Sequence, residues 1–192
     1  MNYVILMKNN IVLIISLVLL FSCSEPKIRK PVVHRSSISY FEESISVNKA
    51  ILKQEEKYFK QIISKDTLNK YISSPYGFWY YYNNNNKSKS QRVKSGDRVV
   101  INYEIRDLNN NILINESELG SKNQKDKKDR LLKIDGENFL LGLHQGIKLM
   151  KKGDVVTFLM PSNQAFGATG FQDLIAPNQA LLIKVKLKKI IK

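Results

Sequence analysis

The sequence is poor in the residues that hold metals, form disulfide bonds or perform acid–base catalysis. It has a single cysteine, Cys23, and only two histidines, His34 and His144. One cysteine excludes an internal disulfide framework and a cysteine-based zinc site. No His or carboxylate cluster has metal-ligand spacing, and no glycine-rich loop ends in a phosphate-binding lysine. We therefore expect no metal and no cofactor, and we expect His144 to be a solvated residue on the polar side of a helix.

Acidic residues are also scarce. There are 17 Asp and Glu against 31 Lys and Arg, which gives a formal net charge of +14. Such an excess can indicate nucleic-acid binding, but here the lysines are scattered and form no basic stripe interleaved with aromatic residues. We expect no nucleic-acid partner, and the charge better fits an anionic lipid surface or an acidic partner. A length of 192 residues with 43% hydrophobic content suits one globular domain with extensions.

The apolar run near the N-terminus is too short for a comfortable transmembrane helix, which needs about 20 residues. It extends from Ile11 to Leu20 behind Lys8, a pattern typical of a secretory signal peptide. Leu20-Phe21-Ser22-Cys23 follows and resembles a bacterial lipobox. The predictions are a signal peptide over residues 1–22 and a lipid anchor on Cys23, with diacylglycerol and a further acyl chain such as palmitate. The alternative is an uncleaved membrane anchor with an incidental cysteine.

This anchor places the protein in the bacterial cell envelope, on a periplasm-facing membrane, with the outer membrane as the expected one. Residues 23–38 contain prolines and mixed charge without periodicity, which predicts a tether. Residues 39–72 form the next segment, an amphipathic helix that extends to about Ser64 and resumes from Leu68 to Ile72. Its apolar face either packs on its own domain, the favoured interpretation, or forms a homodimer or binds a partner.

Several later segments have the composition or the period-two alternation of strands. They are Phe78–Tyr82, Arg98–Arg106, Ile112–Ile114, Val155–Met160 and Leu181–Ile190. The last of these alternates apolar residues with lysines, which is typical of a protected edge strand. Residues 121–130 are rich in charge, and we predict a surface loop there.

One short segment has the spacing of an amphipathic helix. Its apolar face consists of Phe139, Leu140, Leu143, Ile147 and Met150. The helix should end at Gly153, a position suited to a left-handed stop. The sequence therefore predicts an α+β fold: an antiparallel sheet of about five strands curved around one central helix, preceded by an N-terminal amphipathic helix.

Four motifs follow one another in this part of the chain. They are Gly142-Leu143-x-x-Gly146, Met150-Lys-Lys-Gly153, Ala165-Phe166-Gly167 and Ile175-Ala176-Pro177-Asn178. In order and spacing they resemble the FKBP-type peptidyl-prolyl cis/trans isomerases, over residues 73–192. The resemblance implies an FKBP-like fold, isomerase activity on proline-containing polypeptide clients and no cofactor.

The resemblance also implies a set of pocket residues. They are Tyr103, Leu113, Phe139, Leu140, Leu143, Phe166, Leu174, Ile175 and Ile183. The backbone N–H of Leu140 would bind the substrate carbonyl. The chain departs from the family pattern at several positions: Leu113 replaces Phe, Ile114 replaces Asp, and Phe166 replaces a Tyr whose hydroxyl bonds the substrate. The alternative is that the same apolar residues form a core without a pocket.

Isomerisation needs no proton transfer, so the scarcity of catalytic side chains does not exclude it. The barrier to rotation about the X-Pro bond, about 18–20 kcal/mol, comes from amide resonance. An apolar cleft favours the twisted amide, which has lost this resonance, over the planar one. The whole chain further resembles the FKBP-type lipoproteins associated with bacterial gliding motility. Two hypotheses follow: an envelope-anchored isomerase that helps exported proteins fold, or a non-catalytic adaptor that holds proline-containing segments of an envelope machine.

Overall fold

The computed structural model describes residues 37–84, 86, 90–115, 129–137 and 139–192, with only the backbone given for 37–40. The chain divides into two units, Met1–Tyr40 and Phe41–Lys192, and the second carries almost all described residues. The predicted signal peptide, Cys23 and the tether up to residue 36 lie outside the described residues.

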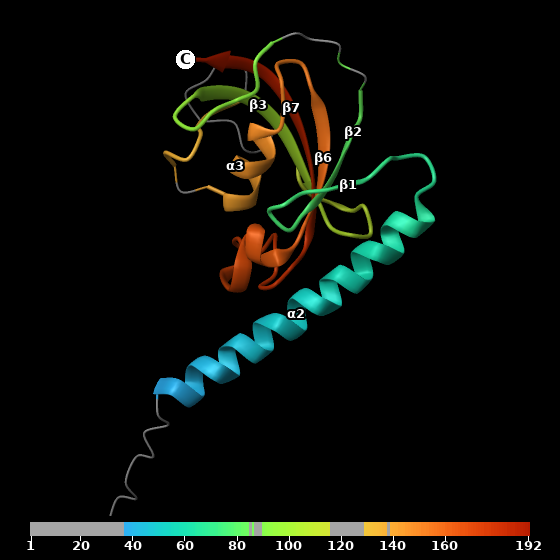
Figure 1. Ribbon diagram of the computed structural model, residues 1–192, viewed down its shortest axis with the longest axis vertical. Coiled ribbons are helices and arrows are strands. Elements are labelled where there is room, and N and C mark those ends of the chain that lie inside the picture. The colour runs from blue at the N-terminus through green and yellow to red at the C-terminus, as the bar shows by residue number, and fades with distance from the viewer. Residues whose placement is uncertain (1–36, 85, 87–89, 116–128, 138) are drawn as a thin grey trace, which may run out of the picture. The chain divides into compact units, whose positions relative to one another are not determined.

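The described residues of the second unit form a seven-stranded sheet in which all the paired strands are antiparallel. The strands are β1 (Ile72–Ser73), β2 (Trp79–Tyr82), β3 (Arg98–Arg106), β4 (Ile112–Ile114), β5 (Arg130–Lys133), β6 (Val155–Met160) and β7 (Leu181–Ile191). Their order is β1-β2-β6-β7-β3-β4, and β5 pairs with β3. Figure 1 labels β1, β2, β6, β7 and β3 of this sheet.

Two details of the predicted sheet are wrong. The sequence predicted about five strands, whereas the sheet has seven. The two strands that were missed are β1, which has only two residues, and β5, which begins in a stretch predicted to be a charged loop. The lysine-lined strand was expected at an edge, yet β7 pairs with β6 on one side and β3 on the other. A central strand can carry lysines when one face is solvated: Lys184 and Lys186 are exposed, whereas the alternate residue Val185 is buried.

The central helix, α3 (Leu141–Lys148), packs on the sheet as predicted (Figure 1). Its predicted bounds are wrong, because Phe139 and Leu140 precede the helix and it ends before the predicted stop at Gly153. Leu143 and Ile147 are fully buried and belong to one core cluster with residues of β3, β6 and β7, such as Phe158. Register shifts interrupt the pairing of β3 with β7 and with β4. Shifts of this kind increase the local twist of a strand, which helps a sheet to curve around a helix. The α+β fold, an antiparallel sheet around one short helix with an N-terminal helix before it, is confirmed.

Close approach of α3 to the sheet depends on two glycines of the first motif. A Cβ at Gly146 would lie 2.7 Å from Cε1 of Phe158 on β6. A Cβ at Gly142 would lie 2.8 Å from the backbone oxygen of Gln164. The spacing of four residues places both glycines on the same helix face, against the strand and the turn that follows it.

Gly146→Ala is expected to lower the free energy of unfolding by about 1–3 kcal/mol, because the added methyl group overpacks the helix–sheet contact. Urea denaturation measures this change. Gly136→Ala is the matched control, since its Cβ would meet only the flexible side chain of Lys133. Equal stability of the two variants would contradict the close packing of α3 on β6.

The N-terminal helix, α2 (Ser37–Lys65), packs on the sheet through its second half. Phe59 is only 2% exposed and forms a cluster with Leu159 of β6 and Ala180. The prediction that this helix packs on its own domain is thus confirmed for its second half. The resumption over Leu68–Ile72 is wrong, because the Asp66 carboxylate accepts the N–H of Leu68 at 3.1 Å and stabilises a turn instead.

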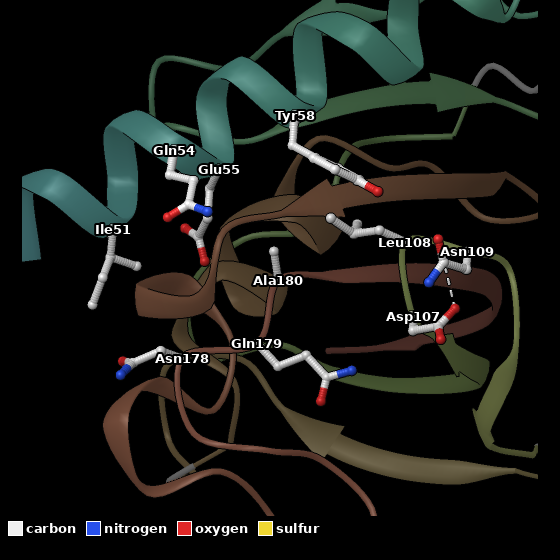
Figure 2. Close-up of a pocket in the computed structure, with 10 residues that line it drawn as sticks. All are labelled: Ile51, Gln54, Glu55, Tyr58, Asp107, Leu108, Asn109, Asn178, Gln179 and Ala180. Atoms are coloured by element: carbon white, nitrogen blue, oxygen red, sulfur yellow. Dashed lines mark hydrogen bonds between the residues drawn. The ribbon is translucent and has the colours of Figure 1, made fainter.

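A buried carboxylate also ties α2 to the sheet. Both oxygens of Glu55 accept the backbone N–H of Ser162 at 3.2 Å, just after β6. Burial raises the pKa of the Glu55 carboxyl, and the hydrogen bonds from Ser162 oppose this. Glu55 lines a groove of about 430 Å³ that lies between α2, the turn after β3 and residues 178–180. Figure 2 shows its carboxyl group among the other lining side chains.

The prediction of a solvated His144 is wrong. The side chain is 2% exposed, and its Nδ1 accepts the N–H of Asp135 at 3.1 Å. Helical periodicity could not show that the turn after β5 covers this face of α3. Burial lowers the pKa of the imidazole, and the Asp135 charge opposes the change. Within the described part of the chain, no helix has the length and apolar character needed to cross a membrane.

Candidate functional site

A cavity of about 450 Å³ opens between one end of the sheet, the start of α3 and the loop that follows β6. Its lining consists of Tyr103, Ile105, Ile114, Arg130, Phe139, Leu140, Ala165, Phe166, Thr169 and Phe171. Tyr103 and Ile105 come from β3, while Phe139 and Leu140 lead into α3. The lining is therefore mostly apolar and aromatic, as expected of a site that binds a proline ring.

The structure brings together four of the predicted pocket residues, namely Tyr103, Phe139, Leu140 and Phe166. Three others lie in the hydrophobic core and not among the lining residues: Leu143 and Ile183 are 0% exposed and Ile175 is 1% exposed. Leu113 is partly buried against the same core, and Leu174 is 43% exposed. Neither of the last two is among the lining residues. The region thus contains both a packed core and an open cavity.

Five lining residues were not predicted, namely Ile105, Arg130, Ala165, Thr169 and Phe171. Ile114 also lines the cavity and was predicted only as a departure from the family pattern. Ile105 could have been predicted from the sequence, because it lies two residues after Tyr103 and therefore on the same face of β3. Arg130 had no such signal, because it ends a charged stretch and its role depends on the pairing of β5 with Ile101 of β3.

Two aromatic pairs shape the cavity walls. The rings of Tyr103 and Phe139 meet edge to face with centroids 5.8 Å apart, and those of Phe166 and Phe171 lie 5.0 Å apart. The guanidinium carbon of Arg130 lies 4.0 Å from the centroid of the Phe139 ring. Contacts of this kind hold side chains in fixed orientations and add stability beyond buried area.

The loop after β6 is fixed by its own backbone bonds. The backbones of Phe171 and Ile175 form two hydrogen bonds. The N–H of Phe171 donates to the carbonyl of Ile175 with N and O 2.9 Å apart, and the N–H of Ile175 donates to the carbonyl of Phe171 at 3.1 Å. Asn178 donates its N–H to the carbonyl of Gly167 at 2.8 Å. Gly170 has φ 64° and ψ −159°, a region open almost only to glycine. These constraints place Phe166 and Phe171 at the cavity.

The polar groups of the cavity suit binding rather than proton transfer. Burial raises the pKa of the Tyr103 phenol, and the nearby Arg130 guanidinium opposes this, so the phenol keeps its proton at neutral pH. Leu140 is the N-cap residue of α3, and no side chain caps the helix. Binding of a substrate carbonyl by its N–H stays a prediction. No group of three or more His, Cys, Asp or Glu side chains suited to a metal occurs among the residues described.

The sequence and the fold match known proteins, and the FKBP-like fold is confirmed. The family model of the FKBP-type peptidyl-prolyl cis-trans isomerases matches residues 89–188. The solved structure of FkpA from Escherichia coli has a TM-score of 0.57 at 21% identity, covering 80% of this chain and 70% of that one. The solved structure of a peptidyl-prolyl cis-trans isomerase from Pseudomonas syringae has a TM-score of 0.56 at 19% identity, and the match covers 75% of this chain and 96% of that one.

Curated relatives match over shorter segments. FK506-binding protein 2A of Rhizopus delemar is 36% identical over 59 residues, which is 31% of this chain and 35% of that protein. A probable isomerase, FkpA of Neisseria meningitidis, is 45% identical over 49 residues, or 26% and 18%. The human inactive isomerase FKBP6 is 34% identical over 61 residues, or 32% and 19%. The matches span about a third or less of these relatives. The family model covers more than half of this chain, which therefore belongs to the FKBP-type peptidyl-prolyl cis-trans isomerase family.

Proposed function

We propose that the protein is an envelope-anchored peptidyl-prolyl cis/trans isomerase that assists the folding of exported proteins. The cavity lined by Tyr103, Phe139, Leu140 and Phe166 supports this most directly. A proline ring would lie between its aromatic walls, where little water remains around the X-Pro amide. The twisted amide has lost its resonance and much of its dipole, so this environment stabilises it relative to the planar ground state.

Exchange spectroscopy by NMR on a short proline peptide tests the activity, because it measures interconversion of both isomers without a coupling protease. The purified protein should raise the exchange rate well above the uncatalysed rate, which has a time constant of about 10–100 s at 25 °C. An unchanged exchange rate with folded protein would contradict the proposal.

The alternative is an adaptor that binds proline-containing segments without turning them over. Phe166 supports it, because it lacks the hydroxyl that the family resemblance places there for substrate binding. One of the relatives is also named as inactive, although that name describes FKBP6 and not this chain. Binding of a proline peptide without faster exchange would favour the adaptor.

Phe166→Tyr distinguishes the two hypotheses. If the protein is an isomerase, the added hydroxyl should raise kcat/KM about fivefold, the effect of a hydrogen bond of about 1 kcal/mol. The comparison uses the same exchange measurement, with Phe171→Tyr as a control that adds a hydroxyl on the neighbouring ring. No turnover in either the wild type or Phe166→Tyr would identify the adaptor.

The anchor is a separate part of the proposal and depends on the lipobox around Cys23. Cys23→Ser should abolish incorporation of labelled palmitate and release the protein from the membrane fraction, or stall it before processing, because the only thiol is lost. Envelope fractionation of labelled cells measures both effects, and the outer-membrane fraction should hold the wild type. Wild-type protein that stays in the membrane without an acyl label would contradict the lipoprotein assignment.

The proposed clients include components of gliding motility. This rests on the resemblance of the lipobox, spacer helix and domain to motility-associated lipoproteins. Deletion of the gene in its own host should impair gliding and lower the folded amount of envelope motility proteins. Normal gliding in the deletion strain would remove motility components from the proposed clients.

A homodimer through α2 is proposed on the exposure of its first half. Phe41 is 66% exposed and Ile45 is 52% exposed, and the apolar stripe of Ile45 continues along α2 to the buried Phe59. A second copy could cover this stripe. Sedimentation of the wild type should show a dimer, and a Phe41→Ser, Ile45→Ser double variant should be monomeric. A monomeric wild type would contradict the proposal.

A further inference from the structure

Of the described residues that line the cavity, one side chain is charged, and it is cationic. Arg130 begins β5, and its guanidinium carbon lies 4.0 Å from the centroid of the Phe139 ring. The side chain is 30% exposed, so the guanidinium lies at the border between the apolar cavity and solvent. A cation in this place can reach a ligand that occupies the cavity.

The hydrogen-bonding capacity of Arg130 is only partly used by the described residues. Its Nη2 lies 4.0 Å from Oε2 of Glu137, which is too far for a hydrogen bond. The other oxygen of Glu137 accepts the backbone N–H of Lys133 at 2.9 Å. The Nε of Arg130 is buried and, within the described part of the chain, has no hydrogen-bond partner. The hydroxyl of Tyr103 also forms a hydrogen bond with the guanidinium. A guanidinium carries five N–H donors, so donors remain for an incoming acceptor.

Among the described residues, the lining includes no carboxylate. The position that the family resemblance associates with Asp holds Ile114, which is 1% exposed. The other polar lining side chains are the hydroxyls of Tyr103 and Thr169, which are neutral. The charge at the described lining is therefore positive, in a chain whose net charge is +14.

We propose that Arg130 makes the cavity select proline-containing segments that carry a carboxylate side chain next to the proline. The planar guanidinium binds a carboxylate through two parallel N–H donors, and its stacking on Phe139 fixes the direction of the fork. A basic residue at the same substrate position would be repelled. This inference rests on the proposed function, because it assumes that proline segments bind in this cavity.

Two series of capped peptides test the selectivity with the full chain purified in non-ionic detergent. One series has Glu, Gln or Lys directly before the proline, and the other has the same residues directly after it. Exchange NMR gives kcat/KM for each peptide relative to its own uncatalysed rate. In at least one series Glu should exceed Gln about fivefold, as expected for a partly exposed ion pair, and Lys should be the poorest. Added salt should shrink the difference.

Variants assign the preference to Arg130. Arg130→Gln should abolish the preference for Glu over Gln, while Arg130→Lys should retain part of it. Lys186→Gln is the matched control, because it removes one charge from an exposed position on the central strand β7, away from the cavity lining. Its preference should equal that of the wild type. Glu137→Gln should increase the preference, because it removes the carboxylate that competes for the guanidinium.

The outcomes separate this inference from the proposed function. Equal turnover of Glu, Gln and Lys peptides would overturn the selectivity and leave the isomerase activity intact. Absence of turnover for every peptide would overturn the activity, and the chemical shift changes on titration with the same peptides would then report the selectivity through Kd. A preference for Glu that Lys186→Gln lowers as much as Arg130→Gln would overturn the role of Arg130 and indicate the overall charge instead.

Discussion

Leu140→Asp is expected to lower kcat/KM for a proline peptide at least about 100-fold, which corresponds to roughly 2.7 kcal/mol of transition-state stabilisation. Leu140 is 4% exposed and lines the cavity at the entry to α3. A carboxylate there would draw water into the cavity and stabilise the polar, planar amide more than the twisted one. Exchange NMR measures the loss of turnover.

A control variant is available at the next residue. Leu141 is 62% exposed, so Leu141→Asp introduces the same charge one residue further along, at a position open to solvent. We expect its activity to stay within about twofold of the wild type, since surface substitutions are usually tolerated. Circular dichroism must show that Leu140→Asp is folded. Wild-type turnover by folded Leu140→Asp would mean that isomerisation takes place elsewhere.

Gly170→Ala is the second change with a large expected effect. Its φ of 64° and ψ of −159° lie in a region that side chains other than glycine's hardly enter, at a cost of about 1–3 kcal/mol. The added Cβ would also collide with the backbone oxygen of Ile175 and lie 2.9 Å from the carbonyl carbon of Ala176. Backbone atoms cannot move aside as a flexible side chain can, so the loop must change its conformation.

Because this loop places Phe166 and Phe171 at the cavity, Gly170→Ala should lower kcat/KM about tenfold or more and reduce stability by about 2 kcal/mol. Gly167→Ala is the control: its φ is also positive, at 59°, but a Cβ there would have no atom within 4 Å. Its loss of stability should be about 1 kcal/mol, the cost of a left-handed residue alone. Equal effects at the two glycines would show that the contact with Ile175 has no importance for the site.

Local periodicity was sufficient for the main elements of the fold. The alternation in Arg98–Arg106 and Val155–Met160 gave strands with the bounds seen in the structure. The apolar stripe that includes Leu143 and Ile147 gave the central helix, because burial on one face leaves a regular trace in the sequence. The central position of β7 in the sheet could not be predicted from local periodicity, since strand order depends on which segments pair across the whole chain.

The cavity was predicted only in part, and the reason is similar. Tyr103, Phe139, Leu140 and Phe166 could be assigned through the family resemblance, and they meet in the structure. An apolar residue looks the same in a sequence whether it lines a cavity, as Leu140 does, or fills the core beneath it.

The sequence by itself determined the fold class, the helix–sheet core and the apolar character of the site, since each depends on residue type and spacing along the chain. Only the tertiary structure decided that Ile183 is fully buried in the core, that His144 is buried by a turn, and that Arg130 reaches the Phe139 ring. These facts arise from contacts between residues distant in sequence or from a loop that covers a helix face. No local pattern records such contacts, because the free energy that selects them comes from the packing of the whole domain.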